Sequence, residues 1–458
     1  MVNPSLPTIW ASTKFTEVLD IQGGTQPPKS QFIDAPKEGY IRLLQIRDFG
    51  KKPVPTYIPD THKLKKCEKT DVLIGRYGAS LGRICTGMEG AYNVALAKVL
   101  APANIEPDFL RRYLESEVFQ APLRLLSRSA QNGFNKGDLD TFDFLLPPVA
   151  EQKVIADKLD TLLAQVENTK VRLQRIPQIL KRFRQSVLSA AARGDLSKGW
   201  RRLNNDRKTS KQLRVEELAK SEKYSLGIGP FGSNLKVSDY RSTGHPLIFV
   251  RDIRSSVFGS ENTKYVSTEK FQELKAHRAL PGDILITKMG DPPGDVCIYP
   301  NSRPEAVITA DCIKLSVDES IANTKYVMYA MQSDQFRALV LDISAGVAQQ
   351  KVNLKKFRKL EIPVPSKKEQ TEIVRRVEQL FAYADTIEQQ VNNALARVEK
   401  LTQSILAKAF RGELTAEWRA QNPELISGDN RAQALLEKIR VERAAAKPSQ
   451  RKKSRARA

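Results

Sequence analysis

Apolar side chains recur at alternating steps of four and three residues along two stretches of the chain. The first stretch carries them at Ile155, Leu159, Leu162, Val166, Thr169, Leu173, Ile176, Leu180, Phe183, Val187 and Ala190. The second carries them at Ile373, Val377, Leu380, Ala384, Ile387, Val391, Ala394, Val398, Leu401 and Ile405. Such a heptad pattern is typical of a coiled-coil seam. It predicts two long helices, each roughly 60 Å long at about 1.5 Å per residue.

The ends and the middle of these helices carry local signals. Pro177 removes one backbone hydrogen bond and can kink a helix. The seam continues in phase after Pro177, so we predict one continuous helix, with a possible bend in the first copy. Each helix is expected to end at a glycine, Gly194 or Gly412, as helix C-caps prefer.

The two stretches belong to an internal repeat. Residues 131–201 align without a gap to residues 349–419, at an offset of 218 residues. The identical pairs include Asn135/Asn353, Pro147/Pro365, Glu151-Gln152/Glu369-Gln370, Gln185-Ser186/Gln403-Ser404, Arg193-Gly194/Arg411-Gly412 and Trp200-Arg201/Trp418-Arg419. A repeat of this length predicts two equivalent structural units.

The segments before each long helix have the pattern of mixed α/β (α+β) globular domains. Short apolar runs at 40–46, 71–74 and 94–100 predict strands, and a helix is expected at 108–126. The second domain repeats this plan loosely, with strands at 282–286 and 311–315 and a helix at 326–341. The predicted segments are domain 1 at 1–148, a coiled-coil helix at 149–205, domain 2 at 206–365, a second coiled-coil helix at 366–420, and a short helix with a basic, disordered tail at 421–458.

The chain connectivity predicts how the two long helices run. The second domain connects the end of the first helix to the start of the second. A domain of about 150 residues has a radius of gyration near 15 Å, so it cannot easily span a rod of roughly 60 Å. The two helices should therefore be antiparallel, with the two domains at opposite ends of a pseudo-two-fold arrangement.

Composition narrows the class of protein. The 458 residues include 74 Lys and Arg against 52 Asp and Glu, a formal net charge of +22. That surplus favours a polyanionic partner such as double-stranded DNA, although a merely basic soluble protein remains an alternative. The four cysteines are far apart and indicate neither a disulfide framework nor a zinc site. Without a signal peptide or a long apolar run, we expect a cytoplasmic protein with no membrane contact.

Motifs that could carry catalysis are weak. The glycine-rich stretch 227–232 matches G-x-G-x-x-G, but a poor strand precedes it and Pro230 interrupts it. The stretch 291–294, Asp-Pro-Pro-Gly, lacks the aromatic residue that a base-flipping methyltransferase loop would stack on its target. The three histidines match no metal or triad spacing, so we expect no bound metal and no catalytic residues.

Recognition of DNA is what remains. Arginine, lysine and amide side chains can form the hydrogen bonds that distinguish base pairs in the major groove. The candidate DNA-binding residues are Thr25, Gln26, Arg47, Arg76, Tyr77, Ser80, Arg83, Gln131, Asn132, Asn135 and Lys136 in domain 1, and Ser233, Asn234, Arg251, Lys288, Gln349, Gln350 and Lys351 in domain 2.

Three segments resemble a known family. The stretches 146–152, 179–185 and 407–414 closely resemble the specificity subunit of bacterial type I restriction–modification enzymes, with the best match to type IA. The resemblance implies a non-catalytic subunit for phage defence, in which each target recognition domain reads one half of an asymmetric DNA site. It also implies that the helices set the spacer and that two modification subunits, which use S-adenosylmethionine to methylate adenine N6, dock on the chain. Two restriction subunits, which use ATP and Mg²⁺, would join them.

Two other classes remain open at this point. A stand-alone methyltransferase would need its own methyl-donor site. A coiled-coil adaptor that joins two protein partners would carry its positive charge incidentally, and its affinity for DNA would depend little on salt.

Overall fold

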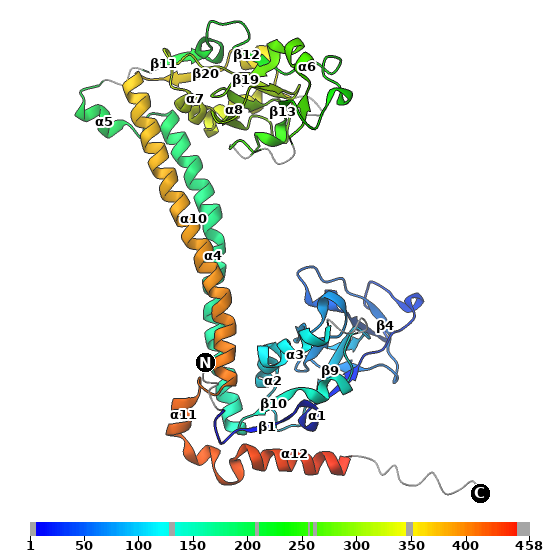
Figure 1. Cartoon of the computed structure of the whole chain (residues 1–458). Coiled ribbons are helices and arrows are strands. Elements are labelled where there is room, and N and C mark those ends of the chain that lie inside the picture. Colours follow the sequence, from blue (N-terminus) through cyan, green and yellow to red (C-terminus); the bar gives the residue numbers. More distant parts are fainter. Residues whose placement is uncertain are drawn as a thin grey trace. The chain divides into compact units, whose positions relative to one another are not determined.

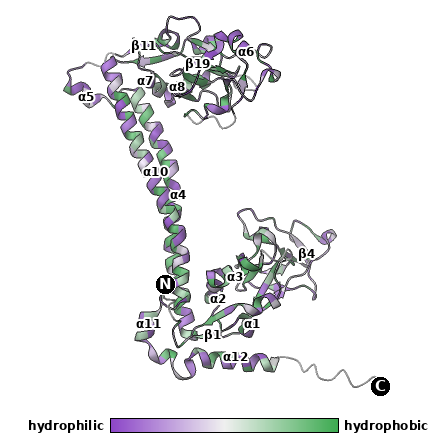
Figure 2. Ribbon diagram, in the orientation of Figure 1, coloured by the Kyte–Doolittle hydropathy of each residue, from purple (hydrophilic) through white to green (hydrophobic). Residues whose placement is uncertain are grey.

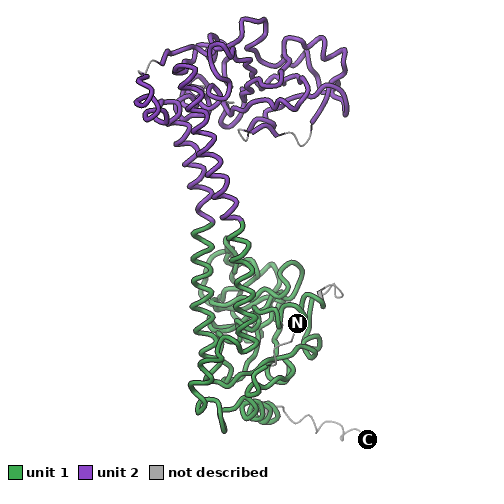
Figure 3. The backbone as a smooth tube through the Cα atoms, turned by 60° about the vertical axis from the view of Figure 1, so that its left-hand side comes forward, with its two compact units in different colours: residues 1–173, 393–458 green, residues 174–392 purple. Residues whose placement is uncertain are grey.

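The computed structural model describes residues 6–127, 133–206, 210–254, 257–259, 263–344 and 351–446. The chain forms two compact units (Figure 3): unit 1 contains residues 1–173 and 393–458, and unit 2 contains residues 174–392. Each unit combines a mixed α/β globular domain with one half of each long helix, which confirms the predicted fold class. Because the division runs through both helices, the five segment boundaries drawn from the sequence stay predictions.

The two long helices are α4 (Val149–Ala192) and α10 (Lys367–Phe410), each of 44 residues (Figure 1). Apolar and polar residues alternate along both (Figure 2). Pro177 lies inside α4, and the helix continues through it. Gly194 and Gly412 follow the two helices with φ of 71° and 75°. This left-handed conformation favours glycine, so the predicted C-caps are confirmed.

The helices pair in opposite directions within each unit. In unit 1 the start of α4 lies beside the end of α10, because Lys158 Nζ donates to the Leu414 carbonyl at 3.2 Å. In unit 2 the last part of α4 lies beside the first half of α10, because the Arg184 guanidinium donates to the carboxylates of Asp385 and Glu388. The predicted antiparallel pairing therefore holds in both units.

Burial along the helices follows the predicted seam except at Thr169 and Leu401, which are both exposed. Ile155, Leu159, Leu180, Val187, Ile373, Val377 and Val391 are buried, and Leu162, Val166, Leu173, Ile176, Phe183, Leu380, Ile387, Val398 and Ile405 are half-buried. The prediction is wrong at Leu401, which is 48% exposed. A helix with 3.6 residues per turn drifts away from a strict heptad. At its end α10 buries Leu406 and Phe410 in the core of unit 1, so Leu401 is left on the outer side.

The globular domain of unit 1 contains two four-stranded sheets, in the orders β2-β9-β6-β7 and β4-β3-β8-β5, and the antiparallel pair β1-β10. The strands are β1 (Ala11–Lys14), β2 (Asp20–Gly23), β3 (Tyr40–Leu44), β4 (Tyr57–Pro59), β5 (Lys66–Cys67), β6 (Leu73–Gly75), β7 (Ile84–Cys85), β8 (Gly90–Tyr92), β9 (Leu96–Leu100) and β10 (Asp143–Leu146). The shorter helices of the unit are α1 (Phe15–Val18), α2 (Pro107–Glu115), α3 (Glu117–Ser127), α11 (Ala416–Gln421) and α12 (Ala432–Ala446).

Unit 2 repeats this topology, with sheets in the orders β12-β19-β16-β17 and β14-β13-β18-β15 and the pair β11-β20. The strands are β11 (Lys211–Arg214), β12 (Leu226–Ile228), β13 (His245–Ile248), β14 (Tyr265–Val266), β15 (Arg278–Ala279), β16 (Ile284–Thr287), β17 (Val296–Ile298), β18 (Ala306–Ile308), β19 (Cys312–Leu315) and β20 (Glu361–Val364). The shorter helices are α5 (Lys198–Leu203), α6 (Thr268–Glu273), α7 (Thr324–Met331), α8 (Asp334–Asp342) and α9 (Leu354–Phe357). The same order of strands confirms the predicted duplication of the scaffold.

The helix that we predicted before each long helix is two helices. In unit 1 the chain breaks between α2 and α3 at Ser116, and in unit 2 it breaks between α7 and α8 at Ser333. Both serines are buried, and each hydroxyl donates to a carbonyl three residues earlier at 2.6 Å. A serine that binds its own backbone competes with the helix, which explains the break. Helix α12 matches the predicted short helix, and the basic tail lies outside the described residues.

Candidate nucleic-acid interface

A buried carboxylate ties the globular domain of unit 1 to both long helices. Glu151, in the first turn of α4, is fully buried. Its Oε1 accepts hydrogen bonds from the Thr415 hydroxyl and from the Arg419 guanidinium, both at 2.6 Å. Its Oε2 accepts a hydrogen bond from the Trp10 indole at 2.8 Å. A buried charge needs such partners. Here they come from the residue before β1 and from the segment after α10.

Unit 2 repeats this arrangement with the roles of the helices exchanged. Glu369, in the first turn of α10, is also buried. Its Oε1 accepts a hydrogen bond from the Ser197 hydroxyl at 2.6 Å and another from the Arg201 guanidinium. The identical Glu and Arg residues of the repeat therefore form one buried ion pair in each unit.

The glutamine after each carboxylate holds the N-cap residue of a short helix, which is Glu106 of α2 in unit 1 and Asn323 of α7 in unit 2. Gln152 accepts from the Glu106 backbone N–H at 2.9 Å and donates to the Pro147 carbonyl at 3.1 Å. Gln370 accepts from the Asn323 backbone N–H at 2.7 Å and donates to the Pro365 carbonyl at 2.8 Å. These two glutamines therefore hold the scaffold together through backbone hydrogen bonds.

Several DNA-binding candidates of domain 1 lie around the end of the central strand β6. Arg76 follows β6, donates to the Phe134 carbonyl at 3.1 Å and lies over the Tyr77 ring at 5.1 Å. The Ser80 hydroxyl donates to the Tyr77 carbonyl at 2.8 Å. Lys136 pairs with Asp20. The structure thus brings side chains from two separate loops of domain 1 together, beside the start of β2.

Two further arginines lie next to this group: Arg47 is on the 3-10 helix η2 (Ile46–Phe49), and Arg83 precedes β7 and reaches the backbone of η2. Arg47 is exposed and donates to the Thr56 hydroxyl at 3.1 Å. The exposed Arg83 donates to the carbonyls of Ile46 and Phe49. Both guanidinium groups are held against the backbone or a hydroxyl, and neither is paired with a carboxylate in the described contacts.

In domain 2 the position of Arg76 is taken by a lysine. Both residues directly follow the central strand, and both backbone N–H groups donate to the residue before the neighbouring strand, Arg76 to Ala95 and Lys288 to Asp311. Lys288 is buried, and its Nζ donates to the Ala310 carbonyl at 3.2 Å. Burial lowers the pKa of Lys288, and the charge of the nearby Lys351 lowers it further.

The remaining domain 2 candidates lie in two other places. Arg251 is exposed on the 3-10 helix η7 (Val250–Asp252), at the place that Arg47 has on η2, with its guanidinium over the Phe249 ring at 4.4 Å. Ser233 and Asn234 are exposed in the loop after β12, where the Ser233 hydroxyl donates to the Asn234 side chain at 3.3 Å.

Some candidates have a structural role or lie outside the described residues. The Asn135 side chain accepts from the Gly137 N–H at 2.8 Å, and the matched Asn353 caps α9 through the Lys355 N–H at 2.9 Å. This capping explains why asparagine recurs in the repeat. Thr25 is half-buried and Gln26 exposed, after β2. Gln131, Asn132, Gln349 and Gln350 lie outside the described residues.

The glycine-rich motif of domain 2 also has a packing reason. A Cβ on Gly229 would lie 2.0 Å from the Thr309 carbonyl oxygen, and a Cβ on the equivalent Gly24 would lie 2.2 Å from the Asn93 carbonyl oxygen. Only glycine allows the backbone after β12 to approach the backbone after β18, and the backbone after β2 to approach the backbone after β8. The second glycine of the motif is therefore explained by this close backbone contact between the two sheets of domain 2.

Comparison with known proteins decides the family. Residues 7–178 and 249–397 match the type I restriction modification DNA specificity domain. The chain is 35% identical to the type I restriction enzyme EcoKI specificity subunit of Escherichia coli K12, over 98% of this chain and 99% of the relative. It is 40% identical to the EcoDI specificity subunit of Escherichia coli, over 84% of this chain and 87% of the relative.

The chain belongs to the family of type I restriction–modification specificity subunits. Its fold resembles the HsdS subunit of Thermoanaerobacter tengcongensis, with a TM-score of 0.56 and 18% identity, over 89% of this chain and 98% of that chain. Such a specificity subunit has a mixed fold with two similar domains, as the duplicated scaffold shows.

Other features of this specificity subunit bear on its chemistry. Over the described ranges, no group of three or more His, Cys, Asp or Glu side chains could hold a metal ion. No helix in the described part of the chain is long and apolar enough to cross a membrane. Phe231 is not among the candidates predicted from the sequence, but it is 69% exposed in the loop of Ser233 and Asn234, and an exposed aromatic ring can stack on a base. An aromatic residue inside a glycine-rich loop was the available signal.

Proposed function

We propose that this specificity subunit recognises a DNA site in two parts, with one globular domain for each half. The formal net charge of +22 favours binding to phosphates. The exposed arginines around the end of β6 and on η7 have the hydrogen-bonding groups that recognise bases in the major groove. The two long helices set the number of base pairs between the halves, because each is a continuous helix of 44 residues.

One observation carries this proposal. The two units share the same strand order and the same buried ion pair, Glu151 with Arg419 and Glu369 with Arg201, while the polar residues at matched loop positions differ. Arg76 in one unit corresponds to Lys288 in the other. A duplicated scaffold with different side chains is suited to read two different half-sites, so the whole site is asymmetric.

The partners follow from the family. The relatives are named as subunits of type I restriction enzymes, and we propose that this chain likewise acts with modification and restriction subunits. Two copies of one modification subunit fit a surface that occurs twice in the chain. The chain binds no cofactor of its own and supplies no catalytic residue, whereas its partners use S-adenosylmethionine, ATP and Mg²⁺.

Mapping of methylated adenines tests the division of labour. The subunit is expressed with its modification partner, and the methylated sequences are compared for the unchanged chain, Arg76→Gln and Lys288→Gln. Each substitution should relax recognition in one half-site by about 1–3 kcal/mol per lost base contact, and the two should affect different halves. The two variants control for each other. A change of both halves by either substitution would contradict the proposal.

Two simpler measurements separate the other classes. The purified chain is mixed with labelled S-adenosylmethionine and DNA, and transfer of label without a partner would show that it is itself a methyltransferase. DNA affinity is then measured at increasing salt. Phosphate contacts predict a steep loss of affinity, whereas an affinity that barely changes would favour an adaptor between proteins.

A further inference from the structure

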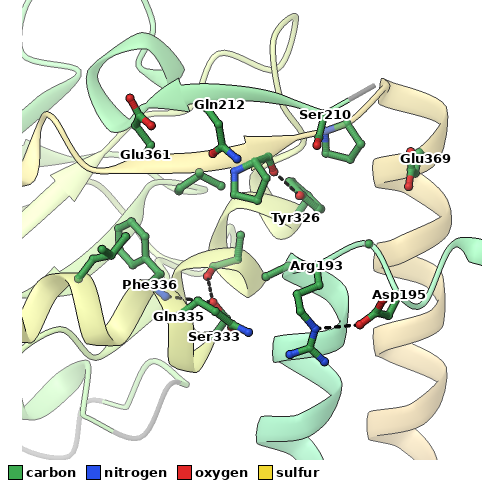
Figure 4. A pocket seen from close by; sticks show the side chains of 17 residues that line it. Arg193, Asp195, Ser210, Gln212, Tyr326, Ser333, Gln335, Phe336, Glu361 and Glu369 are labelled. Atoms are coloured by element: carbon green, nitrogen blue, oxygen red, sulfur yellow. Dashed lines mark hydrogen bonds and ion pairs between the residues drawn. The ribbon is translucent and has the colours of Figure 1, made fainter. Parts of the chain in front are cut away.

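Unit 2 contains a cavity of about 440 Å³ next to the end of α4 (Figure 4). Its walls come from the strands β11 and β20, the helices α7 and α8, and the residues around Gly194, and Glu369 of α10 contributes to the lining. Ligand pockets in proteins are typically about 300–1,000 Å³. The cavity is therefore large enough for a small organic molecule or an inserted side chain.

Strand register shows which residues of unit 1 correspond to the cavity wall. The pairs β1-β10 and β11-β20 have the same register, in which the first residue of one strand is opposite the last residue of the other. The residues before β1 and β11 are therefore equivalent, and they are Trp10 and Ser210. The repeat itself matches Phe410, the last residue of α10, with Ala192, the last residue of α4.

A third wall position follows from the serines that separate the short helices. Ser116 donates to the Tyr113 carbonyl, and Ser333 donates to the Ala330 carbonyl, each at 2.6 Å. Tyr113 and Ala330 are therefore equivalent. Tyr113 is fully buried, and burial raises the pKa of its phenol.

The cavity exists because unit 2 has small side chains where unit 1 has three rings. Trp10, Tyr113 and Phe410 belong to one buried cluster in unit 1, with the rings of Tyr113 and Phe410 edge to face at 5.8 Å. Ser210, Ala330 and Ala192 line the cavity of unit 2.

The carboxylates beside these positions differ in one bond. In unit 1 the Glu151 Oε2 accepts the indole N–H of Trp10. In unit 2 the Glu369 carboxylate has two described side-chain donors. They are Ser197 and Arg201, and both donate to Oε1. Glu369 Oε2 corresponds to the Glu151 oxygen that accepts the indole N–H in unit 1. Within the described residues Glu369 Oε2 has no side-chain donor, and Glu369 lines the cavity.

We infer that the cavity of unit 2 is a binding site for a flat aromatic ring that carries an N–H donor, with indole as the simplest example. The ring takes the space that Trp10 fills in unit 1, and its N–H donates to Glu369 Oε2. The ring can belong to a free heteroaromatic molecule or to a tryptophan side chain of another polypeptide. This site is separate from the loops proposed to contact DNA.

Titration of the full-length chain with indole tests the site. Ligand-observed NMR should show saturable binding of indole. Binding of 1-methylindole should be at least about tenfold weaker, because it lacks the N–H and a hydrogen bond to a charged group contributes enough for that ratio. A third titration uses N-acetyltryptophanamide: binding shows that a tryptophan within a polypeptide fits, and no binding limits the site to free heteroaromatic molecules. Absence of indole binding, or equal affinity for 1-methylindole, would overturn the inference.

Variants locate the binding site. Ser210→Trp fills the cavity from the chain itself and should abolish indole binding, and Ala330→Tyr should do the same from the opposite wall if the first variant does not fold. Trp10→Ser opens the matched position of unit 1 and should add a second indole site, which provides the positive control. Retention of indole binding by a folded Ser210→Trp or Ala330→Tyr variant would contradict the inference. None of these measurements uses DNA, so their failure would leave the proposed function standing.

Discussion

Unit 1 and unit 2 share one junction, a buried ion pair between the start of one long helix and the segment after the other, but they fill the space beside it differently. In both, a glutamate at the start of a long helix is buried and paired with an arginine that follows the other long helix. In unit 1 the Trp10 indole donates a hydrogen bond to the Glu151 carboxylate, and the rings of Trp10, Tyr113 and Phe410 fill the adjacent space. In unit 2 the equivalent space is an open cavity.

The difference shows which part of the duplicated scaffold tolerates change. The ion pair cannot change one residue at a time, because loss of either partner leaves a buried charge. The rings contribute packing, which can be lost in steps at a cost that depends on the space left behind. The repeat thus keeps its polar junction and diverges in the apolar filling beside it.

Substitution of the junction arginines should give the largest effect. Arg201→Met and Arg419→Met should each lower the free energy of unfolding by about 3–5 kcal/mol. Arg201→Met should cost more, because Glu369 then keeps only the Ser197 hydroxyl, whereas Glu151 keeps two donors. Urea unfolding measures both.

The matched control is Arg411→Met, which removes an exposed pair with Glu413 and should cost about 0–1 kcal/mol. If the junction variants were as stable as this control, the ion pair would not stabilise the unit in which it lies. Equal losses for Arg201→Met and Arg419→Met would show that the indole bond of unit 1 adds nothing.

The close backbone contact at Gly24 and at Gly229 should be equally sensitive to substitution in both units. Gly24→Ala and Gly229→Ala place a methyl group against a carbonyl oxygen at about the same distance, and each should cost about 1–3 kcal/mol through overpacking. Thermal unfolding compares them with Gly199→Ala, whose Cβ would meet nothing within 4 Å. A tolerated alanine at Gly229 beside a damaging one at Gly24 would break the equivalence of the two loops.

The smallest changes in stability should come from one matched pair of seam positions that the two units bury to different extents. Phe183 and Leu401 are matched in the repeat, yet Phe183 packs against the core of unit 2 while Leu401 is exposed. Phe183→Ala should lower the free energy of unfolding by about 1–3 kcal/mol, and Leu401→Ala should change it by less than about 0.5 kcal/mol. Similar losses at both positions, measured by urea unfolding, would restore Leu401 to the seam.

Insertions explain why the sequence revealed one part of the duplication and hid another. From residue 131 to residue 201 the two copies keep one offset of 218 residues, so the helices and their capping glycines could be predicted. The offset is 200 residues between Trp10 and Ser210 and 217 between Tyr113 and Ala330. These equivalences are fixed by hydrogen bonds between strands and helix ends, which no linear alignment contains.

The candidate site shows the same limit. Residue type suggested Arg76, Arg83 and Asn135 alike, because all three can bind a base edge. The fold places Arg76 and Arg83 around the end of β6, but it uses the Asn135 side chain to cap a turn. A polar side chain in a loop satisfies either its own backbone or a ligand, and the sequence alone does not distinguish these uses.

The sequence by itself determined the two long helices, their ends, the duplication and the surplus of positive charge, because these depend on periodicity and composition along the chain. Tertiary structure decided which carboxylate meets which arginine, where the heptad stops being buried, and that one unit is filled with rings while the other keeps a cavity. Those outcomes depend on contacts between residues that are distant in the sequence, and the packing of each unit selects them.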